Sequence, residues 1–260
     1  MAQKRNRSRP PRNTSWDPLA SWYDGWVGEG GSHHHQKLAI PAILRLLQAS
    51  AGEQVLDVGA GQGVLAPHIQ SSGAHYTGVD TSPKLIRMAR QRHGKAGNFF
   101  VGDARQLPEI SGIGQDFFDA AVFLLSIQDM DPLDEVFDSV SWALKKSSRL
   151  VLLMTHPAFR VPRQSGWGWD EGRKLRYRRV DRYLTPLPVP LKPFPGEKGV
   201  SRSFHRPLQL YVNGLAGCGY WVDRLEEIPT YKKARGPRAK AENLANSEIP
   251  LFLGIRARRK

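Results

Sequence analysis

The segment Val55-Leu56-Asp57-Val58-Gly59-Ala60-Gly61-Gln62-Gly63 restricts what this chain can fold into more than any other part of it. A short apolar stretch that contains one carboxylate runs directly into three glycines with the spacing Gly-x-Gly-x-Gly. Glycine lets the backbone adopt positive φ angles and lets a ligand lie against the main chain. The segment therefore predicts a strand that turns sharply into a helix, with a ligand held at the turn.

Strands and helices alternate on both sides of this segment. Such alternation predicts a mostly parallel sheet covered by helices on both faces. A chain of 260 residues is long enough for one such domain with appendages. Strands are predicted at 54–58, 75–79, 98–101, 118–125, 149–154, 220–225 and 250–255, and helices at 36–49, 62–71, 83–92, 132–145 and 207–216.

Three segments do not follow this pattern. Residues 1–15 are polar and basic, and are predicted to be a disordered tail. Residues 16–35 combine four aromatic side chains with several glycines and are predicted to form a partly helical aromatic lid. Residues 155–205 are rich in proline, arginine and aromatic residues, and are too long for a plain connector. They are interpreted as a substrate-region insertion within a domain that spans 36–257.

Two further carboxylates follow predicted strands. Asp80 ends the strand 75–79, 21 residues after Gly59, and Asp103 follows the strand 98–101. The first can accept hydrogen bonds from ribose hydroxyls, and the second can accept one from the exocyclic amine of adenine. A dinucleotide turn has the spacing Gly-x-Gly-x-x-Gly instead, and no phosphate requires Asp57 before the turn. The set therefore favours an adenosine ligand that carries a cation.

The chain thus has four features in order: Asp57, the glycine turn, Asp80 and Asp103. With them, residues 36–155 resemble the class I S-adenosylmethionine-dependent methyltransferases. Residues 206–257 resemble the same family in their order of helices and strands. The resemblance implies an α/β, Rossmann-like fold with a seven-stranded, mostly parallel sheet whose last strand is antiparallel. It also implies S-adenosyl-L-methionine as cofactor and methyl transfer as activity. The implied cofactor-binding residues are Asp57, Gly59, Ala60, Gly61 and Gly63 for the methionine part, Asp80, Thr81 and Ser82 for the ribose, Asp103 and Ala104 for the adenine, and Leu125 and Ser126 after the fourth strand.

Within that superfamily, the segments 21–24 and 129–132 resemble the ubiquinone/menaquinone-type small-molecule methyltransferases. In that subgroup a Tyr-Asp pair in the lid covers the cofactor, which implies that Tyr23 lies near it; the alternative is a packing role for Tyr23. Gln128 stands where the subgroup often has a histidine, which argues against a quinone as acceptor.

Two histidines are candidate catalytic bases, because an imidazole titrates near pH 6.5. His156 begins the insertion and His205 precedes the helix 207–216, and each has a structural role as its alternative. Residues 33–35 are three adjacent histidines, which cannot all face one metal, so no metal site is predicted. Cys218, the only cysteine, is predicted to be a small buried residue at a turn, which argues against methylation of cytosine carbon 5.

The net charge of +14 is concentrated in three acid-free runs, at 1–12, 232–240 and 256–260, while 156–182 holds eight basic residues and three acids. Such runs attract polyanions without specifying them. Two acceptor classes follow. The first is a small anionic or aromatic metabolite, methylated at O, N or C; the second is RNA, docked through the basic tails and residues 156–182. A single cysteine and the lack of a long apolar stretch predict a cytoplasmic protein without a membrane span.

Overall fold

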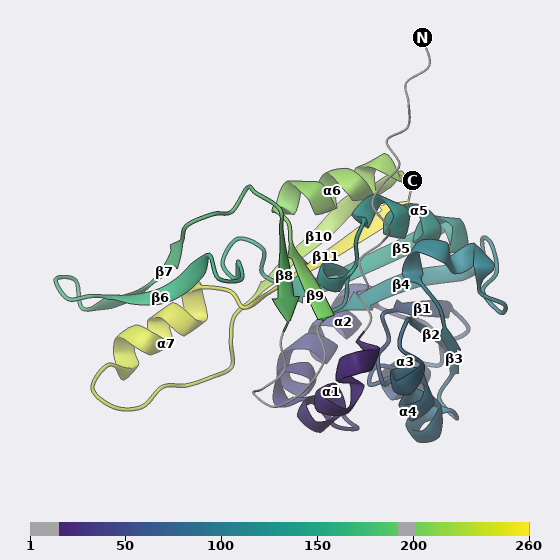
Figure 1. Ribbon diagram of the computed structural model, residues 1–260, viewed down its shortest axis with the longest axis horizontal. Coiled ribbons are helices and arrows are strands. Elements are labelled where there is room, and N and C mark those ends of the chain that lie inside the picture. Colours follow the sequence, from purple (N-terminus) through teal and green to yellow (C-terminus); the bar gives the residue numbers. More distant parts are fainter. Residues whose placement is uncertain (1–15, 192–200, 260) are drawn as a thin grey trace, which may run out of the picture.

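A computed structural model describes residues 16–191 and 201–259. The predicted basic tail, 1–15, lies outside the described residues, as do 192–200 and Lys260. The core is a seven-stranded sheet in the order β10-β11-β5-β4-β1-β2-β3 (Figure 1). Its strands are β1 (Gln54–Val58), β2 (His75–Asp80), β3 (Asn98–Val101), β4 (Phe118–Leu124), β5 (Leu144–Thr155), β10 (Tyr220–Ile228) and β11 (Phe252–Arg259).

Strand directions agree with the fold class expected from the sequence. Strands β1 to β5 pair in parallel, whereas β11, the last strand, is antiparallel to both β5 and β10. β11 extends further than the predicted 250–255 and contains residues 256–259 of the C-terminal basic run. Arg256 and Arg258 both donate to the carboxylate of Asp223 on β10, at 2.8–3.0 Å. This run was expected to be a tail, but in the structure two of its three arginines are paired with a carboxylate of the sheet.

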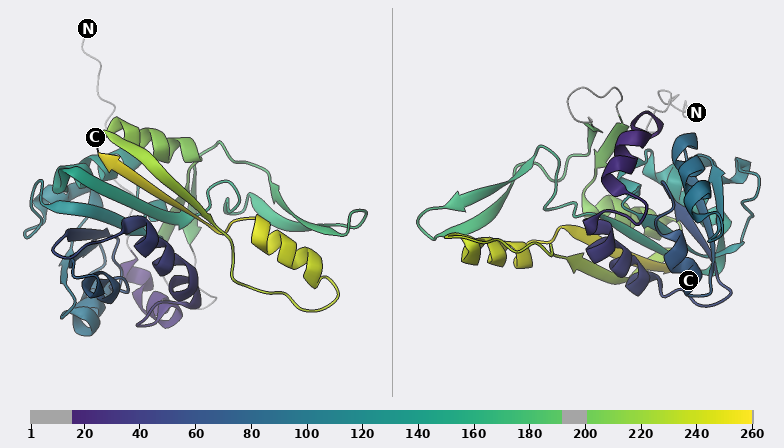
Figure 2. Two further views of the ribbon diagram at one scale, coloured as in Figure 1. Left: turned by 180° about the vertical axis from the view of Figure 1, so that it is seen from behind. Right: turned by 90° about the horizontal axis from the view of Figure 1, so that it is seen from below.

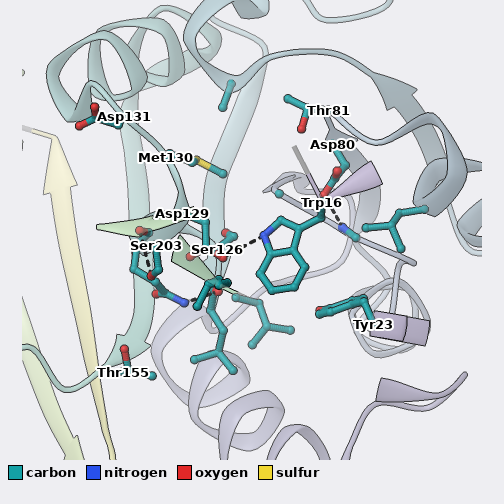
Figure 3. Close-up of a pocket in the computed structure, with 18 of the residues that line it drawn as sticks. Trp16, Tyr23, Asp80, Thr81, Ser126, Asp129, Met130, Asp131, Thr155 and Ser203 are labelled. Carbon is teal, nitrogen blue, oxygen red and sulfur yellow. Dashed lines mark hydrogen bonds between the residues drawn. The ribbon is translucent and has the colours of Figure 1, made fainter. Parts of the chain in front are cut away.

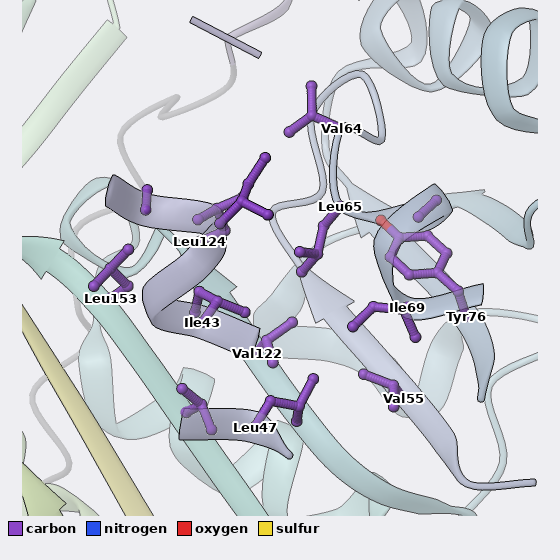
Figure 4. Close-up of a cluster of buried hydrophobic side chains, with 14 of the residues drawn as sticks. Ile43, Leu47, Val55, Val64, Leu65, Ile69, Tyr76, Val122, Leu124 and Leu153 are labelled. Carbon is purple, nitrogen blue, oxygen red and sulfur yellow. The ribbon is translucent and has the colours of Figure 1, made fainter. Parts of the chain in front are cut away.

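Helices cover both faces of the sheet. One face packs against α2 (Ile40–Leu47), α3 (Ala66–Ser71) and α4 (Pro83–His93), and the other against α5 (Leu133–Ala143) and α6 (Leu208–Gly217). Successive residues of a strand point to opposite faces, so Val55 joins the first buried cluster and Leu56 the second. Figure 4 shows the first cluster, in which Ile43 and Ile69 pack against the sheet.

The helix after the glycine turn begins later than the sequence indicated. A helix was predicted from residue 62, but α3 begins at Ala66, because Gly61 and Gly63 both have positive φ angles (+56° and +81°). The start of α4 matches the prediction. The hydroxyl of Ser82 accepts a hydrogen bond from the amide of Leu85, and Pro83 occupies the first turn.

The segment expected to be a lid is helical. Residues 16–35 contain a short 3₁₀ turn, η1 (Asp17–Leu19), and α1 (Ala20–Val27). A single π-helical turn, η2 (His35–Ala39), then leads into α2. Two further 3₁₀ segments, η3 (Ala104–Glu109) and η4 (Ile127–Asp129), follow β3 and β4. Among the described residues, no helix is both long enough and apolar enough to cross a membrane.

The insertion contains two hairpins that the sequence did not indicate. β6 (Ser165–Asp170) pairs with β7 (Leu175–Val180), and β8 (Leu187–Leu191) pairs with β9 (Ser201–His205). A helix, α7 (Ala239–Glu248), was also missed in the β10–β11 connection, where only a basic loop was expected. α7 packs against β7, so 165–182 and 230–248 together form a projection, called the arm below (Figures 1 and 2).

Candidate cofactor and acceptor site

A cavity of about 520 Å³ lies where β1, β2 and β4 end (Figure 3). Ligands of open α/β sheets bind at this edge, near the point where the strand order reverses. The cavity brings together most of the predicted site. The predicted residues that line it are Tyr23, Gly59, Gly61, Asp80, Thr81, Asp103, Ala104, Leu125 and Ser126.

The glycine turn forms one wall of this cavity. Gly59 has a φ of +76°, and a Cβ atom there would lie 2.5 Å from the Cβ of Ser126. The loop after β4 therefore reaches the turn only because this residue has no side chain. Gly63 has a different role. It lies outside the lining, and a Cβ on it would lie 2.7 Å from the Phe99 ring, so its lack of a side chain allows core packing.

Asp80 is fixed at the edge of the cavity by two backbone amides. Its Oδ2 accepts from Gly61 at 2.9 Å and its Oδ1 from Ser82 at 2.8 Å. Burial raises the pKa of this carboxyl, while the two amides lower it and the charge of Asp17 raises it. Ser82 itself is buried outside the lining, and its hydroxyl donates to Asp17 at 2.8 Å.

Asp57 lies beneath the turn and not in the cavity wall. It is buried next to the equally buried Ala60, and its Oδ2 accepts a hydrogen bond from the hydroxyl of Tyr76 at 2.8 Å. Within the described chain, its Oδ1 has no hydrogen-bond partner. Burial raises the pKa of Asp57 to about 7, despite the Tyr76 hydrogen bond, and the nearby charge of Asp80 adds to this. Asp57 and Asp80 each raise the cost of a negative charge on the other, so a cationic ligand nearby would stabilise both carboxylates.

Asp103 lines the far end of the cavity next to Ala104. Its two oxygens accept from the guanidinium of Arg105 at 2.5–3.1 Å. Burial acts to raise the pKa of this carboxyl, but the hydrogen bonds from Arg105 lower it overall. The sequence did not indicate that Arg105 would line the cavity and hold Asp103 as a carboxylate.

Aromatic side chains from the predicted lid line the cavity. Trp16 stacks on Trp22, whose ring centroid is 6.5 Å away, and Tyr23 packs against Trp16 at 5.2 Å. The Tyr23 ring lies 3.6 Å from the position of a Cβ on Gly61. Burial, followed by the charges of Asp80 and other carboxylates, raises the pKa of Tyr23, so its phenol is protonated.

Asp129 places a carboxyl at the cavity and was not among the predicted catalytic residues. It lies at the end of η4, and its Oδ2 accepts a hydrogen bond from Trp16 Nε1 at 3.1 Å (Figure 3). Burial raises the pKa of Asp129 to about 7, although hydrogen bonds from Ser203 and Trp16 act to lower it. The resemblance of the segment 129–132 to small-molecule methyltransferases was the signal that could have identified Asp129.

The other end of the cavity contains a half-buried cation, Arg160. Its guanidinium lies over the ring of Trp167, together with those of Arg176 and Arg178, at 4.3–5.3 Å from the ring centroid. Burial and the two neighbouring cations lower the pKa of Arg160 to about 10. Within the described part of the chain, Arg160 pairs with no carboxylate and donates only to backbone carbonyls, so an anion here would relieve the repulsion.

The two histidines predicted as bases are buried outside the cavity lining. His156 Nε2 lies 2.9 Å from Glu227 Oε1, and burial lowers the pKa of this imidazole although Glu227 acts to raise it. His205 Nε2 lies 2.6 Å from the carbonyl of Tyr183. The histidines that do line the cavity are His34 and His35, and burial lowers the pKa of His35 to about 4. No group of three or more potential metal ligands occurs among the residues described here.

Comparison with known proteins was decisive for the family. Residues 32–185, more than half of the chain, match the family described as a methyltransferase domain. The chain belongs to this methyltransferase family. Together with the fold, this confirms the class I S-adenosylmethionine-dependent methyltransferases and S-adenosylmethionine as cofactor.

Individual relatives match this methyltransferase over part of their length. A demethylmenaquinone methyltransferase of Tropheryma whipplei (strain Twist) is 30% identical over 120 residues, 45% of this chain and 48% of its own. A ubiquinone biosynthesis O-methyltransferase of Xylella fastidiosa (strain M23) is 26% identical over 146 residues, which are 55% of this chain and 59% of that protein. The chain thus spans about half the length of these curated relatives. A solved S-adenosylmethionine-dependent methyltransferase of Mesorhizobium loti has a TM-score of 0.66 and 27% identity, covering 84% of this chain and 96% of that one.

Proposed function

We propose that this methyltransferase transfers the methyl group of S-adenosylmethionine to a small, anionic or aromatic acceptor. The observation that carries the proposal is the cavity, which the lid aromatics cover and which holds the carboxyl of Asp129 and the cation of Arg160. A metabolite fits such an enclosed space, whereas a base in RNA must first leave its stack. The relatives named for menaquinone and ubiquinone synthesis support a small acceptor.

The cofactor, when bound, supplies a methyl group already activated by a sulfonium cation. In the proposal, Gly59 and Gly61 leave room for its methionine part, and Asp57 supports the ammonium through the free Oδ1. Asp80 accepts from the ribose hydroxyls with Thr81 beside it, and Asp103 with Ala104 borders the adenine. Leu125 and Ser126 complete the wall, while Ala60, Gly63 and Ser82 support the turn from behind.

Asp129 is proposed as the group that takes the acceptor's proton. A base with a pKa near the operating pH is the most effective one, and this carboxyl has a pKa of about 7. An acceptor oxygen or nitrogen that takes the methyl group would lose its proton to the carboxylate of Asp129. The catalytic roles of Tyr23, His156 and His205 stay predictions. To reach the cavity, His156 would have to leave Glu227, and His205 would have to leave the carbonyl of Tyr183.

Arg160 is proposed to bind an anionic group of the acceptor. Guanidinium pairs well with carboxylate or phosphate, and this one lies next to two further cations. Thr155, Leu251 and Phe252 line the same cavity and give it an apolar surface for the body of the acceptor. RNA stays the second candidate acceptor, because the basic arm begins a few residues after Arg160. A cytoplasmic location stays a prediction.

Methyl-labelled S-adenosylmethionine, offered with a small-molecule extract or with deproteinised RNA, tests the proposal. Label is expected in the small-molecule pool, resistant to RNase, and absent with the Asp80→Ala variant. Label found only in the RNA pool, and lost on RNase treatment, would replace the small acceptor with RNA.

A further inference from the structure

Nearly all the net positive charge of the described residues lies on the arm. Residues 165–182 and 230–248 contain 11 Lys and Arg against five Asp and Glu, a net charge of +6. The other described residues contain 19 Lys and Arg against 18 Asp and Glu, a net charge of +1. The arm projects away from the sheet (Figures 1 and 2). A charge separated in this way from a nearly neutral body points to an acidic partner that binds the arm.

One face of the arm carries an open aromatic surface. Tyr177 on β7 lies directly opposite Gly168 on β6, and a Cβ on Gly168 would lie 2.4 Å from the Cζ of Tyr177. The ring therefore lies across the glycine, with its other side toward solvent, and Tyr177 is 47% exposed. The next pair of the same face is Gly166 opposite the exposed Arg179. Glycines at both positions leave a shallow surface next to the ring.

The tip of the arm holds an excess of cations around a second cavity of about 580 Å³, between the hairpin and α7. Four cations line it, and the guanidinium of Arg238 lies 4.5 Å from the ring centroid of Trp169. Glu171, the one acid in this lining, pairs with Lys174 at 3.0 Å and with Arg238 at 3.5 Å. In the described part of the chain, Arg173 and Lys240 have no ion-pair partner, so both are free to meet an anion.

We propose that the arm binds single-stranded nucleic acid, with a base stacked on Tyr177 on one face of the hairpin. The strand then passes the β6–β7 turn, where Arg173 holds a phosphate, and reaches Lys240 on the α7 face. Exposed aromatic rings beside a positively charged surface are how such strands are bound without sequence preference. An acidic protein or a lipid surface would use the charge, but a nucleic acid carries both a flat ring and an anion in every repeat of its chain, which matches an exposed ring beside free cations. This binding does not depend on which acceptor receives the methyl group, because the arm lies outside the reaction cavity.

Fluorescence anisotropy on the full chain tests the proposal, with labelled 15-nucleotide oligouridine and oligothymidine as probes. Tyr177→Ala and the double variant Arg173→Ala/Lys240→Ala are each expected to weaken binding about fivefold or more. Tyr177→Trp, which keeps an aromatic face, should retain it. The matched control is Arg87→Ala/Lys146→Ala, which removes the same charge from exposed positions on α4 and β5 and should change affinity less than about twofold.

Three outcomes would overturn the proposal. Equal losses in the arm and control variants would mean attraction by net charge alone. Unchanged affinity in Tyr177→Ala, with its circular dichroism spectrum retained, would exclude stacking. Binding to poly-L-glutamate or to phosphatidylglycerol vesicles as tight as to the oligonucleotides, and equally sensitive to Tyr177→Ala, would assign the arm to a protein or a membrane. The two oligonucleotides distinguish RNA from DNA as the source of the strand.

Discussion

Trp16 Nε1 donates a 3.1 Å hydrogen bond to Asp129 Oδ2, and this contact joins the lid to the loop after β4 across the mouth of the cavity. The donor belongs to the segment that covers the site, and the acceptor is the carboxyl proposed to take the proton. A single hydrogen bond therefore links closure of the lid to the orientation of the base.

Removing this hydrogen bond should loosen the lid. Trp16→Phe keeps an aromatic ring but loses the N–H donor, and a hydrogen bond to a carboxylate contributes about 1.5–3 kcal/mol. We expect the dissociation constant for S-adenosylmethionine, measured by calorimetry, to rise about tenfold. Trp26→Phe, the same change at a lid residue that is 55% exposed, is the control and should have little effect. Equal affinities in both variants would mean that the hydrogen bond does not hold the lid.

Loss of the Asp80 carboxylate should impair cofactor binding and leave the fold intact. Asp80→Ala removes the acceptor proposed for the ribose hydroxyls, and an increase of the dissociation constant of at least about tenfold is expected. The Asp134→Asn variant, changed at an exposed carboxylate on α5, is the comparison. An unchanged affinity in Asp80→Ala would refute the proposed cofactor site.

Asp129 should make stability depend on pH in a defined direction. Its folded pKa of about 7 lies above its unfolded value of about 3.9, so the folded state binds more protons between these values. The unfolding free energy therefore receives a contribution that is lost as pH rises from about 4 to about 7. In Asp129→Asn this contribution is absent. Urea unfolding at pH 4.5 and pH 8 should show the variant gaining about 1–3 kcal/mol over the parent protein at the higher pH. A constant difference at both pH values would contradict the raised pKa.

Arg160 should affect the acceptor and not the cofactor. With Arg160→Ala, label transfer to the small-molecule pool should fall about tenfold or more, because an ion pair to the acceptor is lost. Calorimetric affinity for S-adenosylmethionine should stay within about twofold. Arg160→Lys should restore only part of the transfer, since lysine lacks the planar pair of donors. The exposed neighbour Arg163, changed to Ala, should leave both measurements as they were. A drop in cofactor affinity instead would place Arg160 in the cofactor site.

Two glycines with nearly the same φ should respond differently to a methyl group. Gly63 (φ +81°) would place a Cβ 2.7 Å from Phe99, whereas Gly52 (φ +82°) has open space there. Gly52→Ala should lose about 1 kcal/mol from backbone strain alone, and Gly63→Ala about 2–4 kcal/mol because overpacking is added. Urea unfolding of both variants measures the difference. Similar losses would mean that Phe99 moves aside freely.

The sequence was most informative where local pattern and tertiary packing agree. The strand 54–58 was predicted with its bounds because three of its five residues are apolar and it ends at glycines that only a turn explains. α7 was missed because only Ala245 is buried, so its residues show little of the apolar periodicity that indicates a helix. The β6–β7 hairpin was missed for a related reason, since every residue of β6 is half-buried and none alternates.

Side-chain direction was the second limit. Thr155 lines the cavity, and successive strand residues point to opposite sides, so His156 turns away toward Glu227. The sequence alone could not show that the His156 side chain points away from the cavity, and its catalytic role stays a prediction. The resemblance at 129–132 pointed to the loop that holds Asp129, but its contacts with Trp16 and Ser203 are long-range, so no local pattern could indicate that its carboxyl enters the cavity.

The way the lid is attached has a consequence for the speed of turnover. Beyond its few buried residues, it is held to α4 by polar contacts: Asp24 pairs with Arg92 at 2.5 and 2.9 Å, and Asp17 with Ser82 and Lys84. Contacts of this kind exchange readily with water and weaken as ionic strength rises. We therefore expect opening of the predicted lid, and with it the departure of the spent cofactor, to become faster as the salt concentration rises.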